Sequence, residues 1–496
     1  MKLSSLVGGL PLTGDLGTDP EVFAVRHDSR AVAPGDLFVA WRGARHDGAA
    51  FAGEALARGA VAVVADRARP AELAATPAAA APWLVAAAPR ALLAALAARL
   101  YGRPDRELRV VGVTGTNGKS TTVELVAAML DAAGVACARL GTLGARFPGF
   151  TGAASERTTP EASDLYRLLV ELRGAGAAAV AMEVSSHALA QGRVAGVEYD
   201  VAVFTNLSRD HFDFHAGFDD YFAAKAKLFE QLKAGGRAVV NVADEHGREL
   251  RARLPAALGF GRGGEVAAAD VRLDRRGIRG EIVTPRGTLA FDSPLLGRYN
   301  LDNLLAAVAV GEALELAPAA IVEGIARTRP LPGRMEPVEV GQGFPVMVDY
   351  AHTDAALEAA IRAVKELAGT RVVVVFGCGG DRDPGKRAHM GRVAGALAEL
   401  PIVTSDNPRS EDPLAIIAAI EEGLRASGNT RYRVVPDRRE AIRRAVAIGA
   451  GEGWAVLVAG KGHEREQIVG DRRLPFSDRE ELERVLVERA AAAAGR

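Results

Sequence analysis

The 496-residue chain has only two cysteines, Cys137 and Cys378, and they do not form a CxxC pair. This excludes a disulfide framework and points to a reducing cytosol. The chain also lacks an excess of one charge, because 61 Lys and Arg residues balance 62 Asp and Glu residues. A general binder of nucleic acid or of a membrane surface needs a basic excess, so the balance argues against both.

Long hydrophobic runs are missing as well. The N-terminal segment 1–14 has no apolar core of signal-peptide length. The most apolar region, residues 71–100, is rich in alanine but is interrupted by Pro77, Pro82, Pro89 and Arg90. A membrane span needs about 20 unbroken apolar residues. We therefore expect a cytoplasmic protein without membrane insertion.

What is present is an ordinary globular composition, with 49% hydrophobic and 25% charged residues. Two proline-punctuated stretches, 101–108 and 327–337, are typical of linkers, because proline stops helices and stiffens connections. They predict domains at 1–108, 109–333 and 334–496.

Apolar runs alternate with helical patterns in the second and third of these parts. The runs predicted as strands are LRVVGVTG, AAVAMEV, DVAVFTN and RAVVNVAD, followed by PVMVDY, RVVVVFG, LPIVTS and WAVLVAG. Near-continuous Val, Ile, Leu and Ala favour parallel strands buried on both faces, hence doubly wound α/β domains. Ligands bind beyond the carboxyl ends of such strands, so functional residues should directly follow these runs.

A glycine-rich turn, TGTNGKSTT at 114–122, joins the first of these strands to a helical pattern. Its glycines let backbone N–H groups wrap phosphate oxygens, and the helix N-terminus adds positive potential. The pattern assigns Lys119 to the β- and γ-phosphates and Ser120 to Mg²⁺. Gly112 lies one residue too early for a full GxxxxGK match, so a simple turn capped by Ser or Thr is the alternative. A GTPase is disfavoured because no Asn-Lys-x-Asp element follows.

Two further strand ends carry side chains suited to a metal. Glu183 ends one predicted strand, and Asp210 and His211 follow another. Mg²⁺ prefers oxygen ligands, which makes Glu183 a better candidate ligand than any single histidine. The alternative is that Asp210 and His211 only cap the helix that follows.

Lys225 lies on an otherwise apolar helical stripe with Tyr221, Leu228 and Leu232, whereas Lys227 does not. If its ammonium cannot reach water, desolvation lowers its pKa and leaves a nucleophilic amine. The alternative is a lysine that extends its charge along the surface to water.

The ordered motifs TGTNGKSTT, EVSSHAL, FTNLSRDH, AAKAKLF, GRYNLDNLLAA, LPGRME and DYAH resemble the Mur ligases over essentially the whole chain. These are ATP-dependent amide-bond-forming enzymes of cell-wall precursor synthesis. RTTPEA, GCGGDRDPGKR, DNPR and AGKGHE narrow the resemblance to members that add meso-2,6-diaminopimelate to UDP-N-acetylmuramoyl-L-Ala-D-Glu through an acyl phosphate. The nearest rivals are a lysine-adding member, a folylpolyglutamate synthase-like ligase and a non-catalytic nucleotide-binding regulator.

The resemblance implies three α/β domains: a smaller N-terminal UDP-binding domain, a central phosphate-loop ATPase with a mostly parallel sheet, and a C-terminal Rossmann-like domain. It implies ATP, two Mg²⁺ ions and a CO₂-derived carbamate on Lys225, in a protein we expect to be a monomer. The implied metal ligands are Ser120, Glu183, His211 and Lys225, and the implied catalytic residues are Lys119, Glu183, His211 and Lys225.

The resemblance also assigns three sets of binding residues. The ATP set is Gly115, Thr116, Asn117, Gly118, Lys119, Ser120, Thr121, Asn303, Arg334, Asp349 and His352. The UDP-dipeptide set is Ser29, Thr158, Thr159, Ser186, Gln191 and Arg193. The diaminopimelate set is Arg382, Asp406, Asn407, Pro408, Arg409, Gly460 and Glu464.

The diaminopimelate set contains the charges that its ligand needs. The far end of diaminopimelate is a zwitterion, so its pocket needs both signs. Arg382 and Arg409 can fork onto a carboxylate, and Asp406 can hold an ammonium. An ordinary Asx-type turn with a solvated arginine is the alternative for DNPR.

Overall fold

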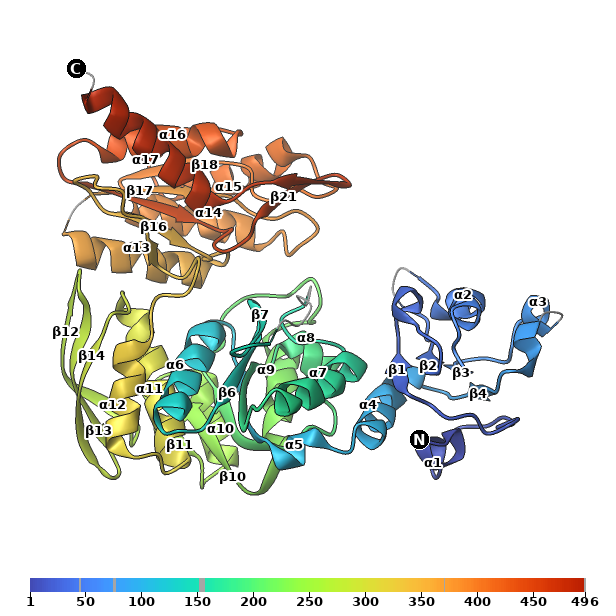
Figure 1. The fold of residues 1–496 in the computed structure, drawn as a ribbon. Coiled ribbons are helices and arrows are strands. Elements are labelled where there is room, and N and C mark those ends of the chain that lie inside the picture. The colour runs from blue at the N-terminus through green and yellow to red at the C-terminus, as the bar shows by residue number, and fades with distance from the viewer. Residues whose placement is uncertain (44–45, 75–76, 151–156, 370, 495–496) are drawn as a thin grey trace. The chain divides into compact units, whose positions relative to one another are not determined.

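The computed structural model describes residues 1–43, 46–74, 77–150, 157–369 and 371–494 (Figure 1). The chain divides into two compact units. One contains residues 1–114, 134–202 and 224–238, and the other contains residues 115–133, 203–223 and 239–496.

The first unit begins with a small α/β sheet. Its four parallel strands run in the order β1 (Ala24–Arg26), β2 (Asp36–Val39), β3 (Ala62–Ala65) and β4 (Trp83–Val85). Successive residues of β2 join different hydrophobic clusters: Leu37 and Val39 join one, and Phe38 joins the other. Both faces of the sheet are therefore buried, as the prediction of a small N-terminal α/β part requires.

The first unit also holds most of a larger sheet. This seven-stranded sheet has the order β11-β10-β9-β5-β8-β6-β7. Its strands are β5 (Arg109–Thr114), β6 (Cys137–Gly141), β7 (Gly144–Arg146), β8 (Ala179–Glu183), β9 (Tyr199–Phe204), β10 (Leu232–Asn241) and β11 (Leu258–Phe260). Strands β5, β6 and β8 pair in parallel, and β7 pairs antiparallel with β6. Every strand predicted for this part of the chain is present.

The helix around Lys225 is shorter than predicted. Helix α9 (Phe218–Ala226) stops before Leu228, a 3₁₀ turn covers Lys227–Gln231, and Leu232 begins β10. The predicted helical stripe therefore ends before Leu232. The burial pattern was nevertheless correct, because Lys225 is only 1% exposed and Lys227 is exposed.

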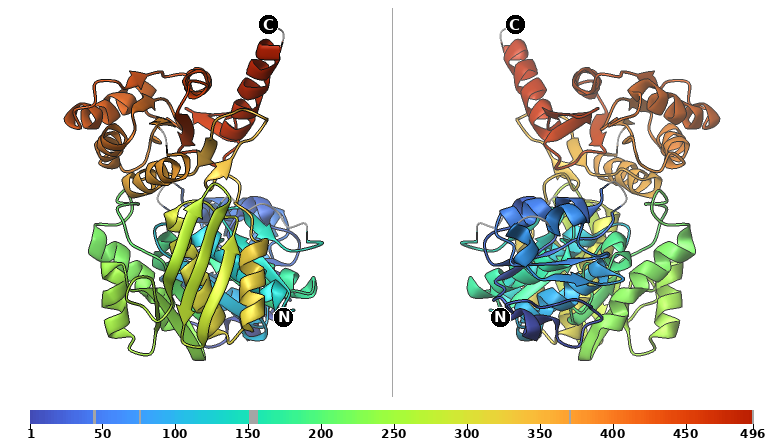
Figure 2. Two further views of the ribbon diagram at one scale, coloured as in Figure 1. Left: turned by 90° about the vertical axis from the view of Figure 1, so that its left-hand side faces the viewer. Right: turned by 90° about the vertical axis from the view of Figure 1, so that its right-hand side faces the viewer.

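The second unit contains an antiparallel sheet that the sequence did not suggest. Strands β12 (Ala267–Asp274), β13 (Gly277–Thr284) and β14 (Gly287–Ser293) lie side by side, with helices α11 (Arg298–Ala313) and α12 (Pro318–Arg327) behind them in Figure 2. Buried and exposed residues alternate along β14. The prediction relied on continuous apolar runs, and a sheet with one solvated face lacks them.

The C-terminal sheet has the doubly wound form that was predicted. Its order is β15-β16-β20-β17-β18-β19, and the four central strands β16 (Val346–Asp349), β20 (Trp454–Ala459), β17 (Arg371–Phe376) and β18 (Leu400–Val403) are parallel. The short strands β15 (Glu336–Pro337) and β19 (Arg433–Val434) close its edges.

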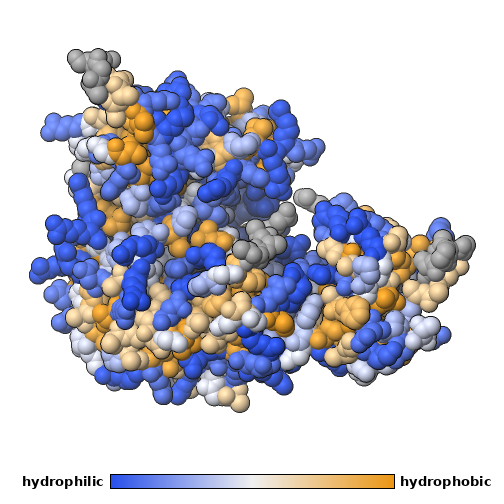
Figure 3. Space-filling view, viewed as in Figure 1, coloured by the Kyte–Doolittle hydropathy of each residue, from blue (hydrophilic) through white to orange (hydrophobic). Residues whose placement is uncertain are grey.

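Helices bury both faces of this sheet. Val372, Val374 and Phe376 pack with α13 (Asp354–Ala368), α14 (Lys386–Leu397) and α15 (Pro413–Ala426). Val373 and Val375 pack with α16 (Arg438–Gly449) and α17 (Asp478–Ala494). The outer surfaces of these helices are left to water, and hydrophilic residues cover most of this part on the face drawn in Figure 3.

Among the described residues, no helix combines the length and the apolar character that crossing a membrane requires.

A buried ion pair fixes α16 to α17. Arg438 Nε and Nη2 each lie 2.7 Å from an Asp478 carboxylate oxygen, and both side chains are 0% exposed. Arg438 Nη2 also donates to the Ala459 carbonyl at the end of β20. The pair therefore links two helices to a strand end.

We expect Arg438→Ala to lower the free energy of unfolding of the C-terminal part by about 3–5 kcal/mol, because it leaves a buried carboxylate uncompensated. Hydrogen exchange of the β20 amides measures this. Arg444→Ala is the control, since Arg444 makes an exposed i,i+4 pair with Glu440 and should cost about 0.5 kcal/mol or less. Equal protection in the two variants would contradict the expectation.

Candidate active site

The phosphate loop lies between β5 and α6 (Lys119–Ala132), as predicted. Gly118 occupies the N-cap of α6 with a left-handed φ of 89°. A Cβ there would lie 2.1 Å from Asn303 Oδ1, so only glycine fits. Lys119 Nζ donates to the carbonyls of Gly115 and Thr116, each at 2.9 Å, which places the ammonium within the loop.

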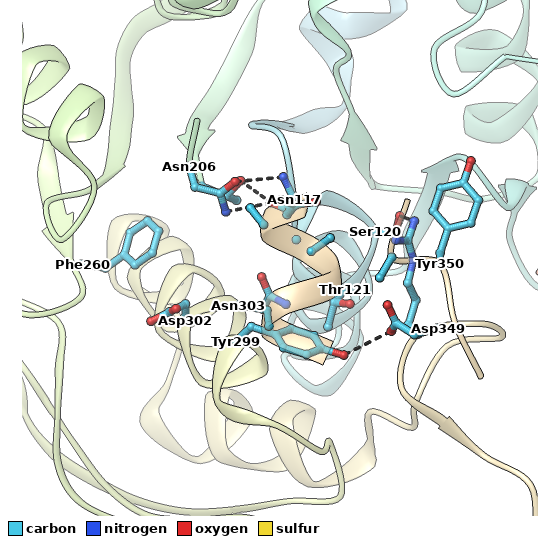
Figure 4. A pocket seen from close by; sticks show the side chains of 17 residues that line it. Asn117, Ser120, Thr121, Asn206, Phe260, Tyr299, Asp302, Asn303, Asp349 and Tyr350 are labelled. Carbon is cyan, nitrogen blue, oxygen red and sulfur yellow. Dashed lines mark hydrogen bonds between the residues drawn. The ribbon is translucent and has the colours of Figure 1, made fainter. Parts of the chain in front are cut away.

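The segment after β9 holds this loop in shape. Asn117 N donates to Asn206 Oδ1 at 2.9 Å, and Thr205 Oγ1 donates to the Asn117 carbonyl at 2.6 Å (Figure 4). Thr116 Oγ1 donates to the Ser208 carbonyl and accepts from Ser208 N. The loop is therefore prepared for a ligand by neighbours that the sequence analysis did not assign to it.

A cavity opens beside the loop, and it gathers most of the predicted ATP residues. The predicted residues that line it are Asn117, Gly118, Ser120, Thr121, Asn303, Arg334 and Asp349. Gly115, Thr116 and Lys119 form the loop itself. Phe260 and Asp302 lie at one end of the cavity and Asp349 and Tyr350 at the other (Figure 4). We name this the nucleotide cavity.

Two of the lining groups are anchored by the protein itself. Asn303 Nδ2 donates to Asn300 Oδ1 at 2.9 Å. Asp349 accepts from Tyr299 Oη at 3.2 Å and from Met335 N at 2.7 Å. Burial raises the pKa of Asp349, although Arg334 and the two donors oppose this rise. Both residues thus shape the cavity as well as lining it.

The guanidinium of Arg334 lies beside the hydroxyl of Ser120, the residue that the loop pattern predicts as a Mg²⁺ ligand. Its Nη2 lies 3.3 Å from Ser120 Oγ, and its guanidinium stacks 4.6 Å from the centre of the Tyr350 ring. Tyr299, Tyr350, Phe260 and Asp302 were not predicted. Burial raises the pKa of Asp302 to about 6. Tyr299, Asp302 and Tyr350 stand within the motifs GRYNLDNLLAA and DYAH, but only the fold shows that they and Phe260 line the cavity.

A second cavity, which we name the amino-acid cavity, lies at the carboxyl ends of β17, β18 and β20. It contains six of the seven residues predicted for diaminopimelate: Arg382, Asp406, Asn407, Arg409, Gly460 and Glu464. Pro408 does not line it and is buried in the turn. His352, predicted for ATP, lines this cavity and not the nucleotide cavity. Tyr350 is shared by both.

Asn407 lines the cavity, and its side-chain amide also makes three hydrogen bonds within the protein. Its Oδ1 accepts from Lys461 Nζ and from Ile468 N, both at 3.0 Å, and its Nδ2 donates to Glu464 Oε2 at 2.8 Å. Lys461 is fully buried and also pairs with Glu464 at 2.9 Å. Lys461 stands in AGKGHE but was not singled out. It neutralises Glu464, which leaves Asp406 as the other carboxylate of the predicted set for a cationic ligand.

Arg409 is held at the rim of the cavity in a strained conformation. Its φ of 51° is unusual for a residue with a side chain, and its Nη1 donates to the Gly380 carbonyl at 2.7 Å. Burial and the charge of Arg382 lower its pKa, although it remains a cation. An acidic ligand group would relieve this repulsion between two guanidiniums.

Asp210 and His211 meet the C-terminal residues here. His211 has a φ of 59°, and its Nε2 lies 3.3 Å from Asp210 Oδ2. His352 Nε2 lies 3.7 Å from the same oxygen. Burial raises the pKa of Asp210, but the hydrogen bond from His352 and the charges of His211, His352 and Lys386 outweigh it and hold the pKa below its usual range. Asp210 is therefore an anion, and it does not cap the next helix, because α9 begins only at Phe218.

The predicted UDP-dipeptide residues form a partly connected group in the first unit. Arg193 Nη1 donates to the Thr159 carbonyl, and its Nη2 donates to Gln191 Oε1. Thr158 Oγ1 lies 3.1 Å from Thr142 Oγ1. Ser29 instead bonds Glu54, and Ser186 is the first residue of α8 (Ser186–Ala190).

Arg90 and Glu161 join this group, although neither was predicted as a site residue. Arg90 Nη2 donates to Glu161 Oε1 at 2.9 Å and to Gln191 Oε1 at 2.8 Å. Glu161, 3% exposed, also pairs with Arg157 and Arg193. Three cations around one carboxylate leave a positive balance suited to an anionic ligand.

The oxygen donors of the predicted metal ligands suit Mg²⁺. The Ser120 hydroxyl lines the nucleotide cavity. Glu183 ends β8 and is 3% exposed; its two oxygens accept from Thr142 N and Thr142 Oγ1 and keep lone pairs to spare. Hydroxyl and carboxylate oxygens, completed by phosphate oxygens, are what Mg²⁺ prefers.

Comparisons with known proteins give a consistent result. Family models match at residues 21–101 (Mur ligase family, catalytic domain), 113–311 (Mur ligase middle domain) and 333–462 (Mur ligase, glutamate ligase domain). The chain is 44% identical to the UDP-N-acetylmuramoyl-L-alanyl-D-glutamate–2,6-diaminopimelate ligase of Solibacter usitatus, covering 98% of this chain and 97% of that one. The ligase of the same name from Geobacter metallireducens is 45% identical, with 93% of each chain covered.

Solved structures agree with this similarity. A structure of a UDP-N-acetylmuramoyl-L-alanyl-D-glutamate–2,6-diaminopimelate ligase superposes with a TM-score of 0.67 at 33% identity and covers 99% of each chain. The MurF ligase of Thermotoga maritima in complex with ADP superposes with a TM-score of 0.65 over 94% of this chain and 98% of that one. At 21% identity, the latter supports the fold alone.

We expect Gly118→Ala to weaken ATP binding about tenfold or more, because its Cβ would strike Asn303 and the residue would be strained at positive φ. Gly134→Ala is the matched control: it follows the same helix at a φ of 78°, with no atom within 4 Å of its added Cβ. Calorimetric titration with ATP measures both, and equal affinities would contradict the proposed packing.

Proposed function

The chain belongs to the Mur ligase family, and from that premise we propose that it adds meso-2,6-diaminopimelate to UDP-N-acetylmuramoyl-L-Ala-D-Glu at the expense of ATP. The observation that carries the proposal is the amino-acid cavity, in which Arg382, Arg409 and Asp406 present both signs of charge. A zwitterionic end group requires such a pair of signs.

The proposed reaction has two steps. The γ-carboxylate of D-Glu attacks the γ-phosphorus of ATP, which forms an acyl phosphate and releases ADP. The amine of diaminopimelate then attacks the acyl carbon; phosphate leaves, the nitrogen loses a proton, and an amide bond remains. Phosphoryl transfer depends mainly on positioning and charge neutralisation, so the residues that line the two cavities are the ones that matter.

Lys119, Arg334 and the loop amides are the proposed phosphate partners. Lys119 Nζ is held by two loop carbonyls and can exchange one of them for a phosphate oxygen. Arg334, beside Ser120, is suited to neutralise charge at the far end of the triphosphate. The adenosine end would then extend toward Phe260 and Asp302, at the opposite end of the cavity.

For Mg²⁺ we propose Ser120, Glu183, His211 and a carbamate on Lys225 as ligands, in keeping with the family. When bound, the metal would neutralise phosphate charge. The burial of Lys225 supports the modification. Burial is costly for an ammonium and favours the neutral amine; the amine nitrogen can then bond to the carbon of CO₂ and lose a proton, which leaves a carbamate anion that can bind a cation.

The domain roles follow the proposed boundaries. Residues 1–108 would hold the UDP part through Ser29, and residues 109–333 would hold ATP and the dipeptide. The dipeptide would meet Thr158, Thr159, Ser186, Gln191 and Arg193. The cluster of Arg90, Arg157 and Arg193 around Glu161 supports an anionic substrate at that position. Residues 334–496 would select the amino acid.

In the amino-acid cavity, Gly460 leaves room for Asp406. A Cβ at Gly460 would lie 2.6 Å from Asp406 Oδ2, so a side chain there would displace the carboxylate that we assign to the distal ammonium. The two guanidiniums would take the distal carboxylate. Lysine has the ammonium but no distal carboxylate, so its binding would leave both guanidiniums without an anion.

We expect Arg409→Ala to raise the KM for diaminopimelate about tenfold or more and to reduce the preference over lysine by a similar factor, because the distal carboxylate loses a bidentate partner. Release of phosphate in the presence of UDP-dipeptide, ATP and each amino acid measures it. Arg392→Ala, an exposed position on α14, is the control. An unchanged preference between the two amino acids would contradict the assignment of Arg409 to the distal carboxylate.

Carbamylation of Lys225 is testable without an activity assay. We expect ¹³C-bicarbonate to give a carbamate signal in the NMR spectrum of the protein that disappears in Lys225→Gln. Lys227→Gln is the matched control two residues away, since Lys227 is exposed. The proposal is contradicted if the signal persists in Lys225→Gln, or if the protein without any substitution gives no signal.

A further inference from the structure

Arg209 and Asp210 are consecutive residues after β9 that contact two different loops of the C-terminal sheet. Arg209 Nε lies 3.1 Å from Asp383 Oδ2, and Arg209 Nη2 lies 3.4 Å from Asp383 Oδ1. Asp210 Oδ2 lies 3.7 Å from His352 Nε2. The Arg209–Asp383 pair has the two-pronged form in which a guanidinium fixes a carboxylate most firmly.

The turn that carries Asp383 is built around this pair. Asp383 is 7% exposed, and its Oδ1 also accepts from Gly385 N at 2.8 Å. A Cβ on Gly385 would lie 2.3 Å from Arg209 Nη2. The backbone of the turn therefore approaches the guanidinium as closely as the absence of a side chain allows.

Two cations flank Asp383 in sequence and line the amino-acid cavity: Arg382 and Lys386. Lys386 is 5% exposed; its charge acts on Asp210 across the cavity, but it makes no ion pair or hydrogen bond with any residue that the structure describes. Arg382 is exposed, and within the described part of the chain it donates only to its neighbour's carbonyl, that of Asp381. The carboxylate nearest to both in sequence, Asp383, is occupied by Arg209.

We propose that Arg209 is a positioning residue for the incoming amino acid. By pairing with Asp383, it keeps that carboxylate from pairing with Arg382 and Lys386, so both cations stay available to a carboxylate of the substrate. The inference rests on the proposed function and adds to it a residue, 173 positions before Arg382, that acts only through the charge of Asp383.

Loss of Arg209 should release Asp383 toward its flanking cations. An intramolecular carboxylate competes at a high effective concentration with the carboxylate of a free amino acid. The KM for diaminopimelate should then rise while the KM for ATP stays nearly constant. Removing Asp383 as well should remove the competitor and recover binding.

The experiment compares Arg209→Ala, Asp383→Ala and the double variant in the phosphate-release assay. We expect Arg209→Ala to raise the KM for diaminopimelate about tenfold, which corresponds to about 1.4 kcal/mol, and the double variant to return to within about threefold of the unmodified protein. If Arg209 only supports the Asp383 loop by packing, the opposite is expected: the double variant would bind diaminopimelate as poorly as Arg209→Ala or worse.

The proposal is overturned if Arg209→Ala leaves the KM for diaminopimelate within twofold, or if the double variant is as impaired as the single one. Should Arg209→Ala not fold, Arg209→Gln with and without Asp383→Asn carries the same comparison. Arg286→Ala is the matched control, because Arg286 pairs with Glu312 at exposures of 35% and 4%, close to the 31% and 7% of Arg209 and Asp383.

The unmodified protein is assayed first. If it shows no phosphate release that depends on diaminopimelate, the proposed function fails. If it does and the variants behave otherwise than expected, only the role of Arg209 fails.

Discussion

The carboxylate of Asp349, at the end of β16, holds three segments together beside the nucleotide cavity. It accepts the Tyr299 hydroxyl from α11 and the Met335 amide from the connection before β15, so one buried group ties a helix, a connection and a strand together. The next residue, Tyr350, lines both cavities. A buried carboxylate without hydrogen-bond donors would cost free energy of folding. The donors from Tyr299 and Met335 reduce this cost and hold the three segments together.

The sequence predicted the site best where the functional residues lie within short local patterns. The phosphate loop, the strand ends at Glu183, Asp210 and Asp406, and the burial of Lys225 all follow from short patterns. The sheet at 267–293 was missed because one solvated face removes the continuous apolar runs on which the prediction relied. Tyr299 and Lys461 were missed because their roles depend on partners that only the fold brings near: Asp349, 50 residues away, and Asn407, 54 residues away.

The amino-acid cavity also shows why residue type alone is a poor guide to which side chains face a ligand. Asn407 and Glu464 suit a zwitterion. However, Asn407 Oδ1 already accepts from Lys461 Nζ and Ile468 N, and the charge of Lys461 offsets that of Glu464. Positive φ values recur in the segments around this cavity: His211, Asp381 and Arg409 all have φ between 51° and 59°. Strain of this kind persists only where the surroundings enforce it, and it is concentrated at functional sites.

The segment 205–210 is short, and it connects the two halves of the proposed chemistry. Thr205, Asn206 and Ser208 bond the phosphate loop, while Arg209 and Asp210 contact loops that line the amino-acid cavity. Successive residues of an extended segment point in different directions, so one strand end can serve both cavities. A shift of the phosphate loop on binding ATP would therefore be transmitted through six residues to Asp383 and His352.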